Sequence, residues 1–103
     1  MAPKVRQAQR AIEKVKLKIS LVDEDSRRHT INWTRPINEK SEVVTARLFE
    51  KTAHVFKLFL KPQGGERQWR RLDDDEVWSE LPPTRYDNGR KVYIIECADV
   101  ALC

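Results

Sequence analysis

The chain has 103 residues and a formal net charge of +4, from 20 Lys and Arg against 16 Asp and Glu. This length suits one small domain, and no apolar run approaches the roughly 20 residues of a membrane helix, so we expect no membrane association. Two Cys are too few for a disulfide framework, and the first residues lack a signal-peptide pattern, so we expect an intracellular protein, cytoplasmic or nuclear.

The first 20 residues hold the excess of positive charge. They carry six basic side chains against one carboxylate, whereas the rest of the chain carries 14 basic and 15 acidic side chains. Val5, Ala8, Ile12 and Val15 are spaced by three or four residues, which is typical of a short helix. Because isolated helices of about twelve residues are marginal, a partial helix and an extended segment remain the alternatives for this basic N-terminal arm, residues 1–14.

Residues 16–36 show a period of two. Leu17, Ile19 and Leu21 alternate with polar side chains in the first half, and the second half alternates in the same way around Trp33. Alternation of this kind predicts half-buried strands. A short polar link joins the two halves, so the segment predicts a β-hairpin.

The segment 41–61 has the clearest helical periodicity. Ser41 is suited to the N-cap position, and Pro62 follows the segment. The residues that fall on one face at helical spacing are Val44, Leu48, Phe49, Thr52, Ala53, Phe56, Phe59 and Leu60. The sequence therefore predicts one long helix over 41–61.

Shorter elements follow the predicted helix. Residues 68–72 are a candidate short strand, and the acidic run 73–76 is suited to begin a helix of one or two turns. In that helix, Trp78 either closes the sheet edge or presents an exposed anchor. A turn at 87–89 precedes residues 91–97, whose nearly continuous apolar character predicts a central strand buried on both faces.

This order of elements predicts an α+β fold. A hairpin, one long helix packed across it, and a final strand parallel to the first is the layout of a mixed β-grasp sheet. In element order and hydrophobic pattern, residues 15–97 resemble the ubiquitin-like β-grasp superfamily. We therefore expect a β-grasp domain over 15–97, with residues 98–103 as a C-terminal tail.

Within that superfamily, the chain is most similar to the Phox/Bem-type domains, which pair a basic face with an acidic loop. Lys16 or Lys18 matches the Lys on their first strand. The acidic cluster of those domains is matched by Asp73, Asp74, Asp75 and Glu76. The resemblance implies head-to-tail association through charge.

Signatures of catalysis are weak. His29 and His54 have no Cys, Asp or Glu at metal-ligand spacing, and Gly64 and Gly65 lack the neighbours of a phosphate-binding loop. We therefore expect no enzyme activity, no metal, no cofactor and no small-molecule ligand.

The charge pattern predicts instead a module that docks another protein or associates with itself. The predicted donors and acceptors are Lys16, Lys18, Arg27 and Arg28 on the hairpin, and Asp73, Asp74, Asp75 and Glu76 in the acidic run. The alternative partner is a nucleic acid, because basic side chains that neutralise phosphates release counterions. The residues predicted for that alternative are Lys4, Arg6, Arg10, Lys14, Arg70 and Arg71, with Trp33 and Trp69 as candidate stacking platforms.

Overall fold

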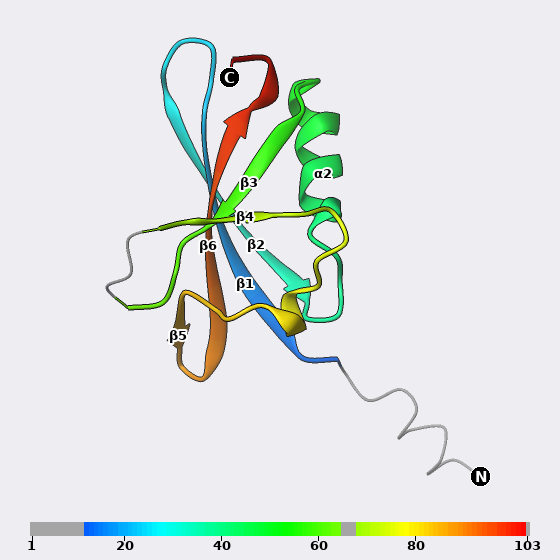
Figure 1. The fold of residues 1–103 in the computed structure, drawn as a ribbon, viewed down its shortest axis with the longest axis vertical. Coiled ribbons are helices and arrows are strands. Elements are labelled where there is room, and N and C mark those ends of the chain that lie inside the picture. The colour runs from blue at the N-terminus through cyan, green and yellow to red at the C-terminus, as the bar shows by residue number, and fades with distance from the viewer. Residues whose placement is uncertain (1–11, 65–67, 103) are drawn as a thin grey trace, which may run out of the picture.

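The computed structural model describes residues 12–64 and 68–102, which form a small α+β protein (Figure 1). In chain order the elements are β1 (Lys14–Val22), β2 (Arg28–Pro36), α2 (Glu42–Thr52), β3 (Phe56–Leu60), β4 (Arg70–Leu72), a 3-10 turn (Trp78–Glu80), β5 (Arg85–Asp87), β6 (Arg90–Asp99) and a second 3-10 turn (Val100–Leu102). The strands make one mixed sheet in the order β2-β1-β6-β3-β4. The short strand β5 is not in this order and pairs only with β6.

The first and last strands lie side by side in the middle of the sheet. β1 and β2 form the predicted antiparallel hairpin, and residues 16–20 of β1 pair in parallel with residues 92–96 of β6. Parallel neighbours need a crossover connection, and α2 is part of that connection, against one face of the sheet (Figure 1). The predicted parallel placement of the last strand beside the first is therefore confirmed.

The helix predicted over 41–61 is wrong in its second half. α2 ends at Thr52, and Ala53 adopts the left-handed conformation with a φ of 62°. The Ala53 N–H donates to the Phe49 carbonyl at 2.8 Å, which is a common way for a helix to end. The Thr52 hydroxyl accepts a hydrogen bond from the His54 N–H at 3.1 Å and fixes the same turn.

β3 occupies the rest of the segment predicted as helix. Phe56, Leu58 and Leu60 are buried toward α2, whereas Lys57 and Phe59 between them are half-buried on the opposite face of the sheet. This period of two is visible in the sequence, but the apolar residues of the segment also fit a helical spacing. Pairing of β3 with both β6 and β4 stabilises the strand.

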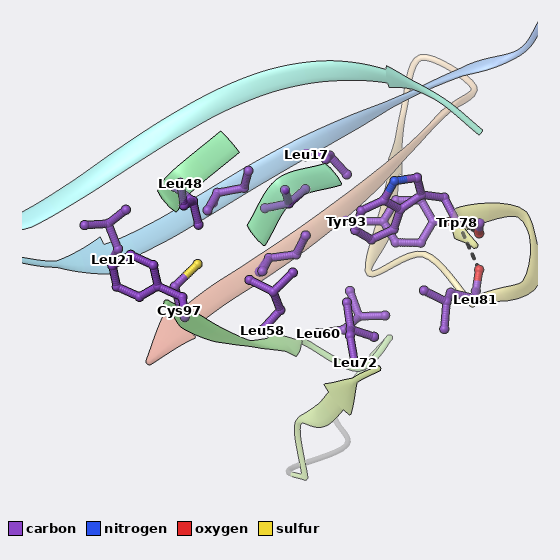
Figure 2. Close-up of a cluster of buried hydrophobic side chains, with 14 of the residues drawn as sticks. Leu17, Leu21, Leu48, Leu58, Leu60, Leu72, Trp78, Leu81, Tyr93 and Cys97 are labelled. Atoms are coloured by element: carbon purple, nitrogen blue, oxygen red, sulfur yellow. Dashed lines mark hydrogen bonds between the residues drawn. The ribbon is translucent and has the colours of Figure 1, made fainter. Parts of the chain in front are cut away.

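The core lies between the sheet and α2 (Figure 2). Trp78 is 0% exposed and packs on Tyr93, with 5.2 Å between ring centroids, so burial decides between the two alternatives for Trp78. The Tyr93 hydroxyl donates to the carbonyls of Trp78 and Leu81 at 2.6 and 3.0 Å, and burial raises the pKa of Tyr93 to about 12. Phe49, predicted on the buried helix face, is 52% exposed.

β6 is the predicted central strand, and its predicted burial on both faces holds only at its start. Tyr93, Ile95 and Cys97 point into the core, whereas on the other face Val92 is 0% exposed, Ile94 is half-buried and Glu96 is exposed. Burial on that face therefore decreases from Val92 to Glu96. The turn before β6 is confirmed: Asn88 and Gly89 have φ values of 51° and 80° between paired strands, as a two-residue hairpin turn requires.

Candidate functional site

Most of the predicted basic donors lie on one face of the sheet. Lys16 and Lys18 alternate with the buried residues of β1, so they point away from α2. Arg28 pairs with Val22 and shares that face, about 13 Å further along the strand from Lys18. Arg27 is exposed in the turn between the two strands. We call Lys16, Lys18, Arg27 and Arg28 the basic hairpin face.

The lysines of the basic hairpin face differ in their neighbours. Lys16 Nζ lies 3.4 Å from the Asp87 carboxylate, and the two side chains are 38% and 45% exposed. An exposed pair of this kind contributes about 0–1 kcal/mol, so it leaves Lys16 able to exchange partners. Lys18 makes no ion pair with any residue that the structure describes.

The acidic run forms a turn, so the predicted start of a helix at 73–76 is wrong. The Glu76 N–H donates to the Asp73 carbonyl at 3.1 Å, and the Glu76 carboxylate accepts the Asp73 N–H at 2.7 Å. The same carboxylate also accepts a hydrogen bond from Arg70. A single 3-10 turn, Trp78–Glu80, follows instead of the predicted longer helix. We call residues 73–76 the acidic loop.

The side chains of the acidic loop differ in their exposure to solvent. Asp73, Asp74 and Asp75 are exposed, whereas the Glu76 side chain is 17% exposed and already bound to Arg70. Glu76 therefore shapes the loop, and the three aspartates carry its outward charge. Sequence reasoning could not separate these roles, because the partner of Glu76 lies on another element.

The backbone of the acidic loop is fixed against the start of α2. The buried Ser41 donates its hydroxyl to the Asp73 carbonyl at 2.8 Å and its N–H to the Glu76 carbonyl at 2.8 Å. The Glu42 N–H donates to the Asp74 carbonyl at 3.2 Å. Ser41 makes no side-chain cap for α2; carbonyls of the acidic loop instead satisfy backbone N–H groups at the helix start.

The sheet order separates the two charged surfaces. β1 lies next to the edge strand β2, and β4, which leads into the acidic loop, is at the other end of the order. Three inter-strand steps of about 4.8 Å separate β1 from β4. No ion pair in the described part of the chain joins the basic hairpin face to the acidic loop. Each surface is thus available to another molecule.

The residues predicted for nucleic acid are divided by the fold. Arg71 pairs with Phe59 and lies on the face away from α2, whereas Arg70 pairs with Leu60 on the core side and binds Glu76. Lys14 shares the face of Arg71. The remaining predicted residues, Lys4, Arg6 and Arg10, lie outside the described residues, as does most of the predicted arm helix. Val15, assigned to that helix, belongs to β1.

The two candidate stacking platforms lie in different surroundings. Trp33 is on the α2 side, where the guanidinium carbons of Arg35 and Arg47 lie 4.5 and 5.4 Å from its ring centre. Trp69 instead lines a hollow of about 430 Å³ on the opposite face, together with Phe59 and Glu96. Phe59 was not predicted as a surface residue. The alternation of residues over 56–60 was the sequence feature that could have predicted its position on this face.

Both histidines bind carboxylates, and those of His54 are distant in the sequence. His54 Nδ1 lies 2.9 Å from Asp99 and its Nε2 lies 3.2 Å from Glu24, which joins the hairpin turn to the end of β6. His29 Nε2 lies 2.6 Å from Asp23, and this hydrogen bond, with the N–H of Arg27, lowers the pKa of Asp23. Among the described residues no group of three or more His, Cys, Asp or Glu side chains is arranged so that it could hold a metal ion.

Cys97 is buried beneath α2, and burial raises the pKa of its thiol to about 12. The thiolate is the reactive form of cysteine, and burial disfavours that form of Cys97 at neutral pH. Its role is to fill the core beside Leu58, its cross-strand partner.

Neither the models of known protein families nor the curated protein sequences match this chain. Over the residues that the structure describes, no helix has the length and apolar character to cross a membrane.

Proposed function

We propose that the chain is a non-catalytic protein-interaction module with a ubiquitin-like β-grasp architecture. The support for the architecture is the strand order, in which the first and last strands are parallel neighbours and an α-helix lies in the crossover between them. The support for a docking role is that charge of opposite sign occupies two separate surfaces. The partner that we propose is a second copy of this chain.

The observation that carries the proposal is the rigid presentation of the acidic loop. Asp73, Asp74 and Asp75 are exposed on a backbone that Ser41 and Glu42 hold through three hydrogen bonds. Side chains on a fixed backbone lose less conformational freedom when they bind. Complementary charge then sets the choice of partner and the association rate more than it sets the affinity.

The placement of the two surfaces favours a head-to-tail contact. The basic hairpin face and the acidic loop belong to different ends of the sheet order, so two molecules that join through them each keep one free surface. A contact between unlike surfaces repeats, and forms open chains or rings rather than closed dimers. Self-association should therefore continue beyond the dimer as the protein concentration rises.

Sedimentation velocity of the full chain at about 50 mM and about 500 mM salt tests the proposal, because salt screens exposed charges. We expect the weight-average mass to rise with protein concentration at low salt and to return to 12.1 kDa at high salt. The variant Asp74→Asn/Asp75→Asn should remain a monomer at both salt concentrations. Glu50→Gln, which neutralises an exposed carboxylate on α2, should behave like the wild type.

Two results contradict the proposal. One is a wild-type chain that stays monomeric at every concentration at low salt. The other is a variant Asp74→Asn/Asp75→Asn that associates as strongly as the wild type.

A further inference from the structure

The face of the sheet away from α2, which we call the open face, is strongly basic. Strand pairing and alternation place eight basic side chains on it: Lys14, Lys16, Lys18, Arg28, Lys57, Arg71, Arg85 and Arg90. The same pairing gives two carboxylates, Asp87 and Glu96. The whole sequence has a net charge of only +4, so charge on this face is concentrated well beyond the average.

The open face also carries aromatic rings beside these charges. Phe59 is half-buried in the row that crosses the sheet from Glu96 to Arg71. Trp69, also half-buried, lines the same hollow as Phe59. Half-buried rings are held in place by their neighbours and still present area to a ligand, and bases of any identity stack on such rings.

Polar groups complete the surface. Thr30, Asn32 and Thr34 of β2 are exposed on the open face, across β1 and β6 from Phe59. Such side chains donate to phosphate and sugar oxygens. The Glu96 carboxylate lies in the hollow with Phe59 and Trp69, where it can accept a hydrogen bond from the exocyclic amine of cytosine, adenine or guanine.

We propose that the open face binds single-stranded nucleic acid. The basic residues would contact the phosphates, and Phe59 and Trp69 would stack on unpaired bases. A duplex hides its bases in its own stack and would meet only the charges. An acidic protein would likewise meet the charges and would gain little from the half-buried aromatic rings. This proposal goes beyond the docking function and does not depend on it.

Fluorescence anisotropy with a labelled single-stranded oligocytidine of about 12 nucleotides, within the usual site sizes of small domains, tests the proposal. The full chain is used with Asp74→Asn/Asp75→Asn in the background, so that self-association does not interfere. We expect salt-dependent binding near 50 mM salt, and at least tenfold weaker binding of a duplex of equal length. A polyglutamate peptide of equal charge, which has no bases to stack on Phe59 and Trp69, should displace the oligonucleotide less effectively than unlabelled oligocytidine does.

Variants separate stacking from charge. Phe59→Ala and Trp69→Ala should each weaken binding about tenfold, within the range for loss of one stacked base. Lys18→Gln should reduce the slope of log Kd against log salt by about 0.7, the value for one phosphate contact to a single strand. Phe49→Ala and Lys51→Gln, which change exposed side chains of α2, should leave both quantities unchanged. Circular dichroism of each variant confirms that the fold is retained.

Several results overturn the proposal. They are no salt-dependent binding near 50 mM salt, equal losses from Phe49→Ala and Phe59→Ala, and displacement of the strand by polyglutamate as effectively as by unlabelled oligocytidine. Another is binding that Lys4→Gln/Arg6→Gln/Arg10→Gln abolishes while Trp69→Ala leaves it intact, because the arm alone would then be the site. The docking proposal, which shares Lys16, Lys18 and Arg28 with the open face, is tested separately by the mass of the chain in the absence of nucleic acid.

Discussion

The basic hairpin face and the acidic loop are built in different ways. In β1, the residues that alternate with Lys16 and Lys18 are buried under α2, so one strand supplies both core and charge. The acidic loop has no such periodicity, and its shape depends on hydrogen bonds to Ser41 and Glu42, more than 30 positions away. A strand thus presents charge through local alternation, whereas a loop needs distant partners to hold its charge in place.

The largest expected change in stability distinguishes the buried side chains of β1 from those on its open face. Leu17→Ala should lower the free energy of unfolding by about 2–5 kcal/mol, because Leu17 is 0% exposed and its loss leaves a cavity. Lys18→Ala, one position later on the open face, should change it by no more than about 0.5 kcal/mol. Urea denaturation of both variants measures the difference. Similar losses would contradict the division of β1 into a structural and a binding side.

The second prediction concerns Ser41, which holds the backbone of the acidic loop. Ser41→Ala should lower the free energy of unfolding by about 1–3 kcal/mol, because it leaves the Asp73 carbonyl without the Ser41 hydroxyl in a buried setting. It should also weaken self-association at low salt, although no charge is changed. Ser79→Ala, at an exposed position, is the matched control. If Ser41→Ala associates like the wild type, a fixed loop is not needed for docking.

The smallest effect concerns the turn of the hairpin. The hydrogen bond from His29 is the main cause of the lowered pKa of Asp23, so the folded chain holds this proton less tightly than the unfolded chain. The contribution of Asp23 to stability is therefore present above its ordinary pKa of 3.8 and is lost as the pH falls through the lower folded value.

Urea midpoints measured between pH 7 and pH 2 test this contribution. The wild type should be more stable than Asp23→Asn at neutral pH, and the two should converge at the acid end of the range. His29→Gln should reduce the wild-type loss below pH 4. Parallel curves for the wild type and Asp23→Asn would show that the turn does not depend on this carboxylate.

Local patterns predicted the parts of the fold that depend on neighbours in sequence. Alternation around Leu17 and Trp33 gave the hairpin, and the Asn88-Gly89 turn and β6 followed from residue type. The second half of the helix over 41–61 failed because its residues fit two periods, and pairing with β6 and β4 selected the strand. Such pairing joins segments that no local pattern relates.

The candidate surfaces also combine features that local sequence patterns predict with features that depend on strand pairing. The common face of Lys16 and Lys18 follows from a period of two and was predictable. The engagement of Glu76 by Arg70, and the meeting of Phe59 with Trp69, depend on how β3 and β4 pair and turn. Those contacts could be read only from the folded chain.

Mixing two complementary variants tests the docking proposal most directly. Lys16→Gln/Lys18→Gln keeps an intact acidic loop, and Asp74→Asn/Asp75→Asn keeps an intact basic hairpin face, so each should be a monomer alone. Together at low salt they have one matching pair of surfaces, and the account predicts a one-to-one complex of about twice the 12.1 kDa chain mass in sedimentation velocity. A mixture that stays monomeric, when the wild type associates under the same conditions, would contradict it.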